Sequence, residues 1–328
     1  MKIIIDNKIP FIRGEAEKLG FKVEYISGSS ISRSDVADAD ILIVRTRTHC
    51  DANLLEGSSV RLVVTATIGY DHLETSWLES NGVSWTNCPG CNASSVKQYV
   101  HNSLLATGYL KSGTTVGVVG VGHVGSLVAD DLEQAGMNVM RCDPPKGEPY
   151  TIEDIAHEAD IITFHTPLTH TGDCPTFHLA NDAFFHRLQK HPVIINSSRG
   201  EVVDNQALIK ALMEGRVCDA IIDTWEGEPR LNLDLLALAV IATPHIAGYS
   251  ADGKANATRM SLEAVCSFAG IKADISIHPP TLPDGYSYGK VASGPLRLYD
   301  PRIDTLRLKS SPSSFESLRG SYPLRREE

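Results

Sequence analysis

Short, continuous apolar runs recur along this chain, and helical patterns separate them. The first third contains KIIID, FKVEYI, DILIVR, RLVVTAT and GVSWTN, and a later region repeats the alternation with TVGVV, NVMRCD, DIITFHT, PVIINSS, CDAIIDT and AVIATPH. Buried strands that alternate with helices need right-handed crossovers and form a mainly parallel sheet. The pattern therefore predicts the α/β class, with two doubly wound parallel-sheet (Rossmann-like) domains and a cleft between them.

Two long helical segments, at about residues 93–110 and 251–269, mark where the chain crosses between the domains. We assign residues 1–92 and about 256–279 to a first domain, which acts as a lid over the substrate, and residues 93–255 to a second. From about His278 the chain is rich in Pro, Gly, Tyr and Ser, and its periodicity is weak. Residues 280–328 are therefore predicted to form a short C-terminal appendage.

Composition excludes several classes of function. The net charge of -10 argues against nucleic acid as a partner, because neutralising phosphates requires clustered Lys and Arg. No apolar run approaches the length that spans a membrane, and MKIIIDNKIP is too short and too acidic for a signal peptide. The seven scattered cysteines fit free thiols in a reducing compartment, so we expect the cytoplasm.

Cys88 and Cys91 have CxxC spacing, but the chain offers no second pair of this kind. A single pair is poor evidence for zinc, and the histidines have no metal-ligand spacing, so we predict no metal. A turn that leads into the following helix is favoured, and a redox disulfide is the alternative.

A glycine-rich turn, GVGHVG at residues 120–125, joins the predicted strand TVGVV to the helical pattern GSLVADDLEQAG. In a dinucleotide fingerprint, Gly120 makes the tight turn, Gly122 lets the pyrophosphate approach the backbone, and Gly125 packs the helix on the strand. The helix N-terminus offers N–H groups to the phosphates. An ordinary glycine turn is the alternative, and the flanking elements favour the fingerprint. The residues expected at the cofactor are Gly120, Gly122, His123, Val124 and Gly125.

The strand after the fingerprint helix ends at Asp143. A carboxylate at this position accepts hydrogen bonds from the ribose hydroxyls and repels a 2′-phosphate, so NAD is favoured over NADP. Arg141 is the opposing signal, because a nearby arginine can accommodate the 2′-phosphate.

Three polar stretches, NSSRGEVVD, DTWEGEP and TPHIAGYS, follow predicted strands. Because ligands of open α/β sheets bind at the carboxyl ends of the strands, Arg199, Glu228 and His245 are expected to converge. Arginine grips a carboxylate through two parallel hydrogen bonds, and histidine exchanges a proton near neutral pH. A glutamate beside that histidine orients it. Each residue alone also fits a solvated loop charge.

These stretches, together with HTPLTHTG and the fingerprint, resemble the D-isomer-specific 2-hydroxyacid dehydrogenase family. The resemblance implies that Arg199 binds the substrate carboxylate and that Glu228 pairs with His245, the acid/base. It also implies a set of residues around NAD beyond the fingerprint: Asp143, Thr166, Ser197, Ser198, Arg199, Asp223 and Gly248.

Further stretches, including VTATIGYDHLE, CPGCNASSV, TPHIAGYSADGKA and SFESLRGSYPLRREE, resemble a branch of the family that acts on a phosphorylated 2-hydroxy acid. The branch implies substrate contacts at Thr46, Thr67 and Tyr249, and a homodimer, although the segment after about Pro279 is shorter than its dimerisation domain. Arg45, just after a strand, is the candidate for the phosphate. A solvated strand end explains this arginine equally well.

The most specific expectation is therefore NAD-dependent oxidation of a phosphorylated 2-hydroxy acid. Two alternatives stay open on the sequence. One is a dehydrogenase of the same family that acts on 3-phosphoglycerate, glyoxylate or hydroxypyruvate. The other is a non-catalytic binding protein that senses NADH with the same fold.

Overall fold

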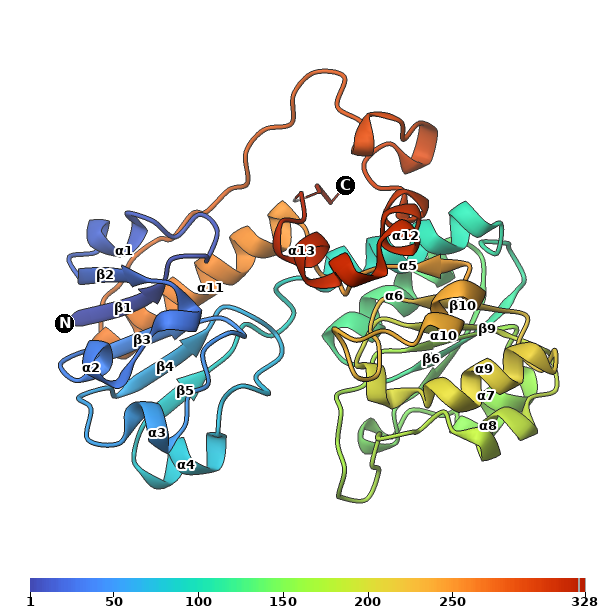
Figure 1. The fold of residues 1–328 in the computed structure, drawn as a ribbon, viewed down its shortest axis with the longest axis horizontal. Helices are drawn as coiled ribbons and strands as arrows, with labels where there is room; N and C mark the ends of the chain where they lie inside the picture. The colour runs from blue at the N-terminus through green and yellow to red at the C-terminus, as the bar shows by residue number, and fades with distance from the viewer. Residues whose placement is uncertain (324, 328) are drawn as a thin grey trace. The chain divides into compact units, whose positions relative to one another are not determined.

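The computed structural model describes residues 1–323 and 325–327 (Figure 1). Contacts divide the chain into unit 1, Met1–Asn92 with Ser250–Thr281, and unit 2, Ala93–Tyr249 with Leu282–Glu328. Each unit contains its own parallel sheet, as predicted. The return to unit 1 comes at Ser250 rather than at about residue 256, because the Ser250 hydroxyl caps helix α11 by accepting from Gly253 N at 2.9 Å. The whole of α11 therefore belongs to unit 1.

Unit 1 is built on a five-stranded parallel sheet in the order β2-β1-β3-β4-β5. Its apolar strands are buried between two helical layers, one with α1 and α11 and the other with α2, α3 and α4. The order reverses at β1, so the loops after β1 and β3 form the switch point. The elements are β1 (Lys2–Asp6), α1 (Glu15–Lys18), β2 (Lys22–Ile26), α2 (Arg33–Val36), β3 (Ile41–Val44), α3 (Ala52–Leu55), β4 (Leu62–Thr65), α4 (Thr75–Ser80), β5 (Ser84–Thr86) and α11 (Ala251–Ala269).

The first helix is much shorter than its pattern suggests. The segment PFIRGEAEKLG has the proline and glycine punctuation of a full helix, but only Glu15–Lys18 is helical. Phe11 has φ 61° and Gly14 has φ 84°, and two residues in the left-handed region interrupt a right-handed helix. The chain therefore makes turns between β1 and α1.

Unit 2 is built on a six-stranded parallel sheet in the order β11-β10-β9-β8-β6-β7. Helices α5 and α6 pack on one face, and α7 to α10 pack on the other. The order reverses at β6, so β6 and β8 border the switch point. The elements are α5 (Ala93–Thr107), β6 (Thr115–Val119), α6 (His123–Gln134), β7 (Asn138–Cys142), α7 (Ile152–Glu158), β8 (Ile161–Phe164), α8 (Asp182–Arg187), β9 (Val193–Asn196), α9 (Asn205–Met213), β10 (Asp219–Ile222), α10 (Leu233–Leu238) and β11 (Ile241–Ala242).

The C-terminal segment begins at Leu282, and its described residues pack into unit 2. It is irregular, as its sequence predicts, apart from α12 (Pro301–Ser310), α13 (Phe315–Gly320) and single 3-10 turns. Helix α12 contacts α5 and β11, and Thr305 Oγ1 accepts from Ala242 N on the edge strand at 3.1 Å. Leu308 and Phe315 enter the core on one face of the sheet, and Tyr299 enters the core on the other. The segment is thus part of the unit 2 core.

Among the described residues, no helix combines the length and the apolar character that crossing a bilayer requires.

Candidate active site

The glycine-rich turn lies where β6 ends and α6 begins. Gly120 has φ 87°, and Gly122 is the N-cap of α6. A Cβ at Gly125 would lie 1.9 Å from Gly120 O, so the first turn of α6 packs directly on the loop. A Cβ at Gly122 would meet no described protein atom within 4 Å. The packing of the protein therefore requires glycine at residue 125. At residue 122 the protein leaves open space, which a pyrophosphate that approaches the backbone closely needs.

The acid at the end of β7 lies against this loop. Asp143 Oδ2 accepts from Val121 N at 2.8 Å, and Lys146 Nζ donates to Val121 O at 2.6 Å. Arg141, the signal for NADP, is paired with Asp130 at 2.8 Å and Glu133 at 2.9 Å on α6. Its charge is therefore neutralised locally, which agrees with NAD as the cofactor.

Four buried polar atoms follow the neighbouring strands β8, β9 and β10 and have no hydrogen-bond partner among the described residues. They are His165 Nδ1, Thr166 Oγ1, Ser197 Oγ and Thr224 Oγ1. Buried polar groups are almost always hydrogen-bonded, so orphaned groups at the carboxyl edge of the sheet indicate a polar ligand. Together with the open space at Gly122, they fit NAD, and two of them, Thr166 and Ser197, are predicted cofactor residues.

Arg199 lies on the loop after β9. Asn196 shapes this loop, because its Oδ1 accepts from Ser198 N at 3.1 Å and its Nδ2 donates to Arg199 O at 2.8 Å. A Cβ at Gly200 would lie 2.1 Å from the carbonyl carbon of Trp225. The backbone beside Arg199 therefore packs directly on the turn that carries Glu228. Arg199 Nη1 donates to Ser198 O at 2.9 Å.

Glu228 and His245 come together as predicted. His245 Nδ1 lies 2.6 Å from Glu228 Oε1, and both side chains are about one-quarter exposed, at 25% and 24%. Burial alone would raise the pKa of Glu228, but the hydrogen bond with His245 and the nearby charge of Arg319 outweigh burial and lower this pKa. Glu228 is therefore ionised at neutral pH and accepts from Nδ1–H, which leaves Nε2 as the nitrogen that can take a proton.

Asp223 holds the loop that presents His245. Its Oδ1 accepts from Ile246 N and its Oδ2 from Ala247 N, at 2.8 and 2.9 Å, and its carbonyl accepts from His245 N at 2.8 Å. Burial raises the pKa of this carboxyl even though the His245 charge and these bonds oppose the shift. His245 has φ 55°, an unusual backbone angle for a side chain of this size. The network around Asp223 accounts for how this conformation is maintained.

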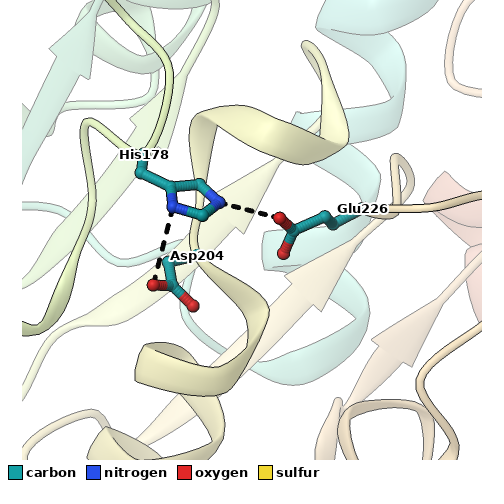
Figure 2. A group of neighbouring side chains, drawn as sticks. All are labelled: His178, Asp204 and Glu226. Atoms are coloured by element: carbon teal, nitrogen blue, oxygen red, sulfur yellow. Dashed lines mark hydrogen bonds and ion pairs between the residues drawn. The ribbon is translucent and has the colours of Figure 1, made fainter.

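A second histidine–glutamate pair lies in the same unit. His178 Nε2 is 2.7 Å from Glu226 Oε1, and its Nδ1 is 3.7 Å from Asp204 Oδ2 (Figure 2). These ligand atoms are close enough to hold a cation. Asp204 also caps α9, and Glu226 Oε2 accepts from Asn205 N. The group thus has a structural role at the start of α9.

The predicted substrate contacts of unit 1 follow adjacent strands. Arg45 and Thr46 follow β3, and Arg45 Nη1 donates to Lys8 O at 2.9 Å. Thr67 follows β4, and its hydroxyl lies 2.7 Å from Thr65 Oγ1 and donates to Gly69 O at 2.8 Å. Hydroxyl groups and Arg45 thus lie in the loops that follow two neighbouring strands, β3 and β4. Tyr249 belongs to unit 2, four residues after His245.

Cys88 and Cys91 are buried thiols, and they do not form a disulfide. Cys91 N donates to Cys88 O at 3.3 Å, so the CxxC segment forms the favoured turn before α5. Burial raises the pKa of Cys88 to about 11, which keeps the thiol protonated at neutral pH.

Two arginines of the C-terminal segment were not predicted to belong near the site. Arg319 Nη1 lies 3.8 Å from Glu228 Oε1, and Arg325 donates to the carbonyls of Ile246, Ala247 and Tyr249. The only sequence signal was the stretch SFESLRGSYPLRREE, which carries no chemical motif that would point to a role.

Comparisons with known proteins agree with this geometry. Residues 92–247 match the model of the D-isomer specific 2-hydroxyacid dehydrogenase NAD binding domain. The whole chain is 50% identical to erythronate-4-phosphate dehydrogenase of Bacteroides fragilis, covering 97% of that protein. It is 40% identical to the enzyme of the same name from Porphyromonas gingivalis, covering 94% of it. Both alignments include the C-terminal segment, because they cover 100% of this chain.

Solved structures show the same fold. NAD+-bound 3-phosphoglycerate dehydrogenase of Entamoeba histolytica has a TM-score of 0.71 and 25% identity, over 82% of this chain and 95% of that one. D-lactate dehydrogenase of Aquifex aeolicus, solved with NAD and lactic acid, has a TM-score of 0.65 and 23% identity, over 82% and 96%. The branch resemblance noted in the sequence is confirmed by the full-length relatives. The chain is an NAD-dependent 2-hydroxyacid dehydrogenase, and it belongs to the erythronate-4-phosphate dehydrogenases within the D-isomer-specific 2-hydroxyacid dehydrogenase family.

Proposed function

We propose that the enzyme oxidises 4-phospho-D-erythronate at C2 to (R)-3-hydroxy-2-oxo-4-phosphooxybutanoate, as a step of pyridoxal 5′-phosphate biosynthesis. The relatives named erythronate-4-phosphate dehydrogenase support this substrate, because the most similar of those described is 50% identical over nearly its full length. The observation that carries the chemistry is the 2.6 Å hydrogen bond between His245 and Glu228.

His245 acts as the general base in this proposal. With Nδ1–H bound to Glu228, Nε2 takes the proton from the C2 hydroxyl as the oxygen becomes a carbonyl. The resulting imidazolium is stabilised by the Glu228 carboxylate, whose pKa is lowered by the same hydrogen bond against the effect of burial. In the reverse direction, the imidazolium returns the proton to the 2-oxo group.

Arg199 binds the substrate carboxylate through its planar guanidinium, and its charge also stabilises the negative charge that develops on the C2 oxygen. NAD, when bound, accepts the hydride that leaves C2. The residues proposed to hold NAD are the fingerprint residues with Asp143, Thr166, Ser197, Ser198, Arg199, Asp223 and Gly248. In this structure the Asp223 carboxylate is already engaged with the His245 loop, so its effect on the cofactor is exerted through that loop.

Thr46, Thr67, Tyr249 and Arg45 are the proposed contacts for the rest of the substrate. Hydroxyl and guanidinium donors suit a phosphate monoester, and Arg45 and Thr67 follow neighbouring strands of the unit 1 sheet. The homodimer and the cytoplasmic location remain predictions from the sequence.

The test is an absorbance assay for NADH with purified enzyme, NAD and a trap for the 2-oxo product. Selective turnover of 4-phospho-D-erythronate over 3-phosphoglycerate, glycerate and lactate supports the proposal. Turnover of a different acid alone would be consistent with the proposed mechanism, but it would exclude 4-phospho-D-erythronate as the substrate. Tight NADH binding without turnover of any 2-hydroxy acid would instead indicate a sensing protein.

A further inference from the structure

A cation from the C-terminal segment lies beside the glutamate–histidine pair. Arg319, on α13, places Nη1 3.8 Å from Glu228 Oε1, the same oxygen that accepts from His245. Its guanidinium carbon also lies 6.0 Å from the centre of the Tyr249 ring. The Arg319 side chain is only 21% exposed, and its Nε is buried without a hydrogen-bond partner among the described residues. A distance of 3.8 Å is too long for a hydrogen bond, so Arg319 acts on Glu228 through its charge.

A second arginine fixes the segment that delivers this charge. Arg325 is fully buried and lies 4.0 Å from the centre of the Tyr299 ring. Its two terminal nitrogens donate to Ile246 O at 2.9 Å and Ala247 O at 2.6 Å. These carbonyls belong to the loop directly after His245, whose N–H groups Asp223 holds from the other side. Arg325 thus anchors the C-terminal segment to the loop that presents His245.

Several titratable or charged groups surround the pair. Asp223 faces it from the end of β10, and Tyr249, on the loop after His245, lies against the Arg319 guanidinium. Arg319 faces it from α13, where Glu316 lies close to the guanidinium. Arg199 comes from the loop that packs, through Gly200, on Trp225. Among these groups, Arg319 is the cation with a described ion pair to Glu228.

We propose that Arg319 is a positioning residue, whose charge keeps Glu228 ionised and sets the pH at which the Glu228–His245 pair takes up its proton. Arg325 supports this role by fixing the C-terminal segment on the His245 loop. The inference rests on the proposed function, because it treats this pair as the acid/base machinery. A cation beside the pair disfavours an added proton, so removing the cation makes protonation easier.

The experiment compares Arg319→Gln and Arg319→Lys with the wild type. The readouts are the pH profile of kcat/KM and the NMR titration of the His245 imidazole, assigned by its loss in His245→Ala. We expect Arg319→Gln to move both midpoints to higher pH by about 0.5 to 1 unit, a range below that of a fully buried charge pair because Arg319 is partly exposed. Arg319→Lys keeps the charge, so both midpoints should return toward the wild-type value.

The matched control is Arg302→Gln, which removes an exposed arginine of the same segment that pairs with Asp300 at 2.7 Å. Its midpoints should equal those of the wild type. Arg319→Met supplies a second neutral side chain of similar length if the Gln variant does not fold. Unmoved midpoints in a folded neutral variant, even with an increased KM, would overturn the inference and indicate a substrate contact instead. An inactive wild type would count against the proposed function alone, because the NMR titration still tests Arg319.

Discussion

Glu226 and Glu228 lie two residues apart in one turn, yet each carboxylate pairs with a different histidine. Glu228 meets His245 at 2.6 Å, and Glu226 meets His178 at 2.7 Å. Only the His245 loop is held by Asp223 and by the buried Arg325. The two distances are similar, but His245 pairs through Nδ1, whereas His178 pairs through Nε2 and has Asp204 beside its Nδ1. The ring nitrogen used and the surrounding network distinguish the proposed catalytic pair from the structural one.

This difference predicts opposite outcomes for the two histidines. His245→Ala should lower kcat by about 10²–10⁴, the usual contribution of general acid–base catalysis. His178→Gln, the matched control, should leave kcat within a few fold of the wild type because His178 supports the start of α9. Steady-state kinetics with 4-phospho-D-erythronate and NAD measures both. A His245→Ala enzyme of nearly normal kcat would exclude His245 as the base.

Arg199→Lys should reduce kcat/KM by about tenfold or more, equivalent to about 1.4 kcal/mol of transition-state binding. Lysine keeps the positive charge but lacks the planar fork that grips both carboxylate oxygens. The measurement is kcat/KM over a range of substrate concentrations, with the thermal unfolding midpoint as a check on folding. An unchanged kcat/KM would mean that Arg199 does not bind the substrate carboxylate.

His72 should make stability depend on pH. Burial lowers the pKa of His72 from 6.5 to about 4. The unfolded chain therefore binds a proton below about pH 6.5 that the folded chain does not accept until about pH 4, so the free energy of unfolding falls as the pH drops through this window. Between pH 7 and pH 5 the loss amounts to about 2 kcal/mol.

His72→Gln keeps a partner for the Thr65 hydroxyl, which lies 2.9 Å from His72 Nε2, and removes the titrating group. Urea unfolding at pH 7 and pH 5 should show a smaller difference in this variant than in the wild type. The exposed His278 offers a control, and His278→Gln should retain the wild-type difference. An equal pH effect in all three proteins would show that other groups cause it.

Much of the fold follows from local sequence because each parallel strand is buried on both faces and reads as a short apolar run. The strand TVGVV is one such case, and it became β6 at Thr115–Val119. The strand predicted at AVIATPH is only partly confirmed, because only Ile241 and Ala242 pair with β10. The N–H of Ala242 bonds instead to Thr305, a residue 63 positions away, which no local pattern reveals.

The candidate site shows the same limit. Glu228 and His245 were predictable because short motifs follow adjacent parallel strands, whose ends must meet at one edge of the sheet. Arg325 was not, because its partners Ile246 and Ser95 are 79 and 230 residues away and are mostly backbone carbonyls. Every residue has a backbone carbonyl, so the sequence does not indicate which carbonyls Arg325 contacts. Only the tertiary structure shows the role of this arginine.

The two glycines of the fingerprint should respond differently to an added methyl group. A Cβ at Gly125 would lie 1.9 Å from Gly120 O, whereas a Cβ at Gly122 would meet no described protein atom within 4 Å. Gly125→Ala should therefore disturb the packing of α6 on β6 and lower the thermal unfolding midpoint by several degrees, as a cost of about 1–3 kcal/mol from overpacking implies.

Gly122→Ala should leave that midpoint almost unchanged, because φ -79° suits any residue. Its methyl group would instead occupy the space into which the pyrophosphate must come, so NADH should bind at least about tenfold more weakly, a loss of about 1.4 kcal/mol. Thermal unfolding without cofactor and fluorescence titration with NADH separate the two effects. Normal NADH affinity in a stable Gly122→Ala protein would mean that the pyrophosphate does not approach this glycine, and the fingerprint would then act only through the packing of α6.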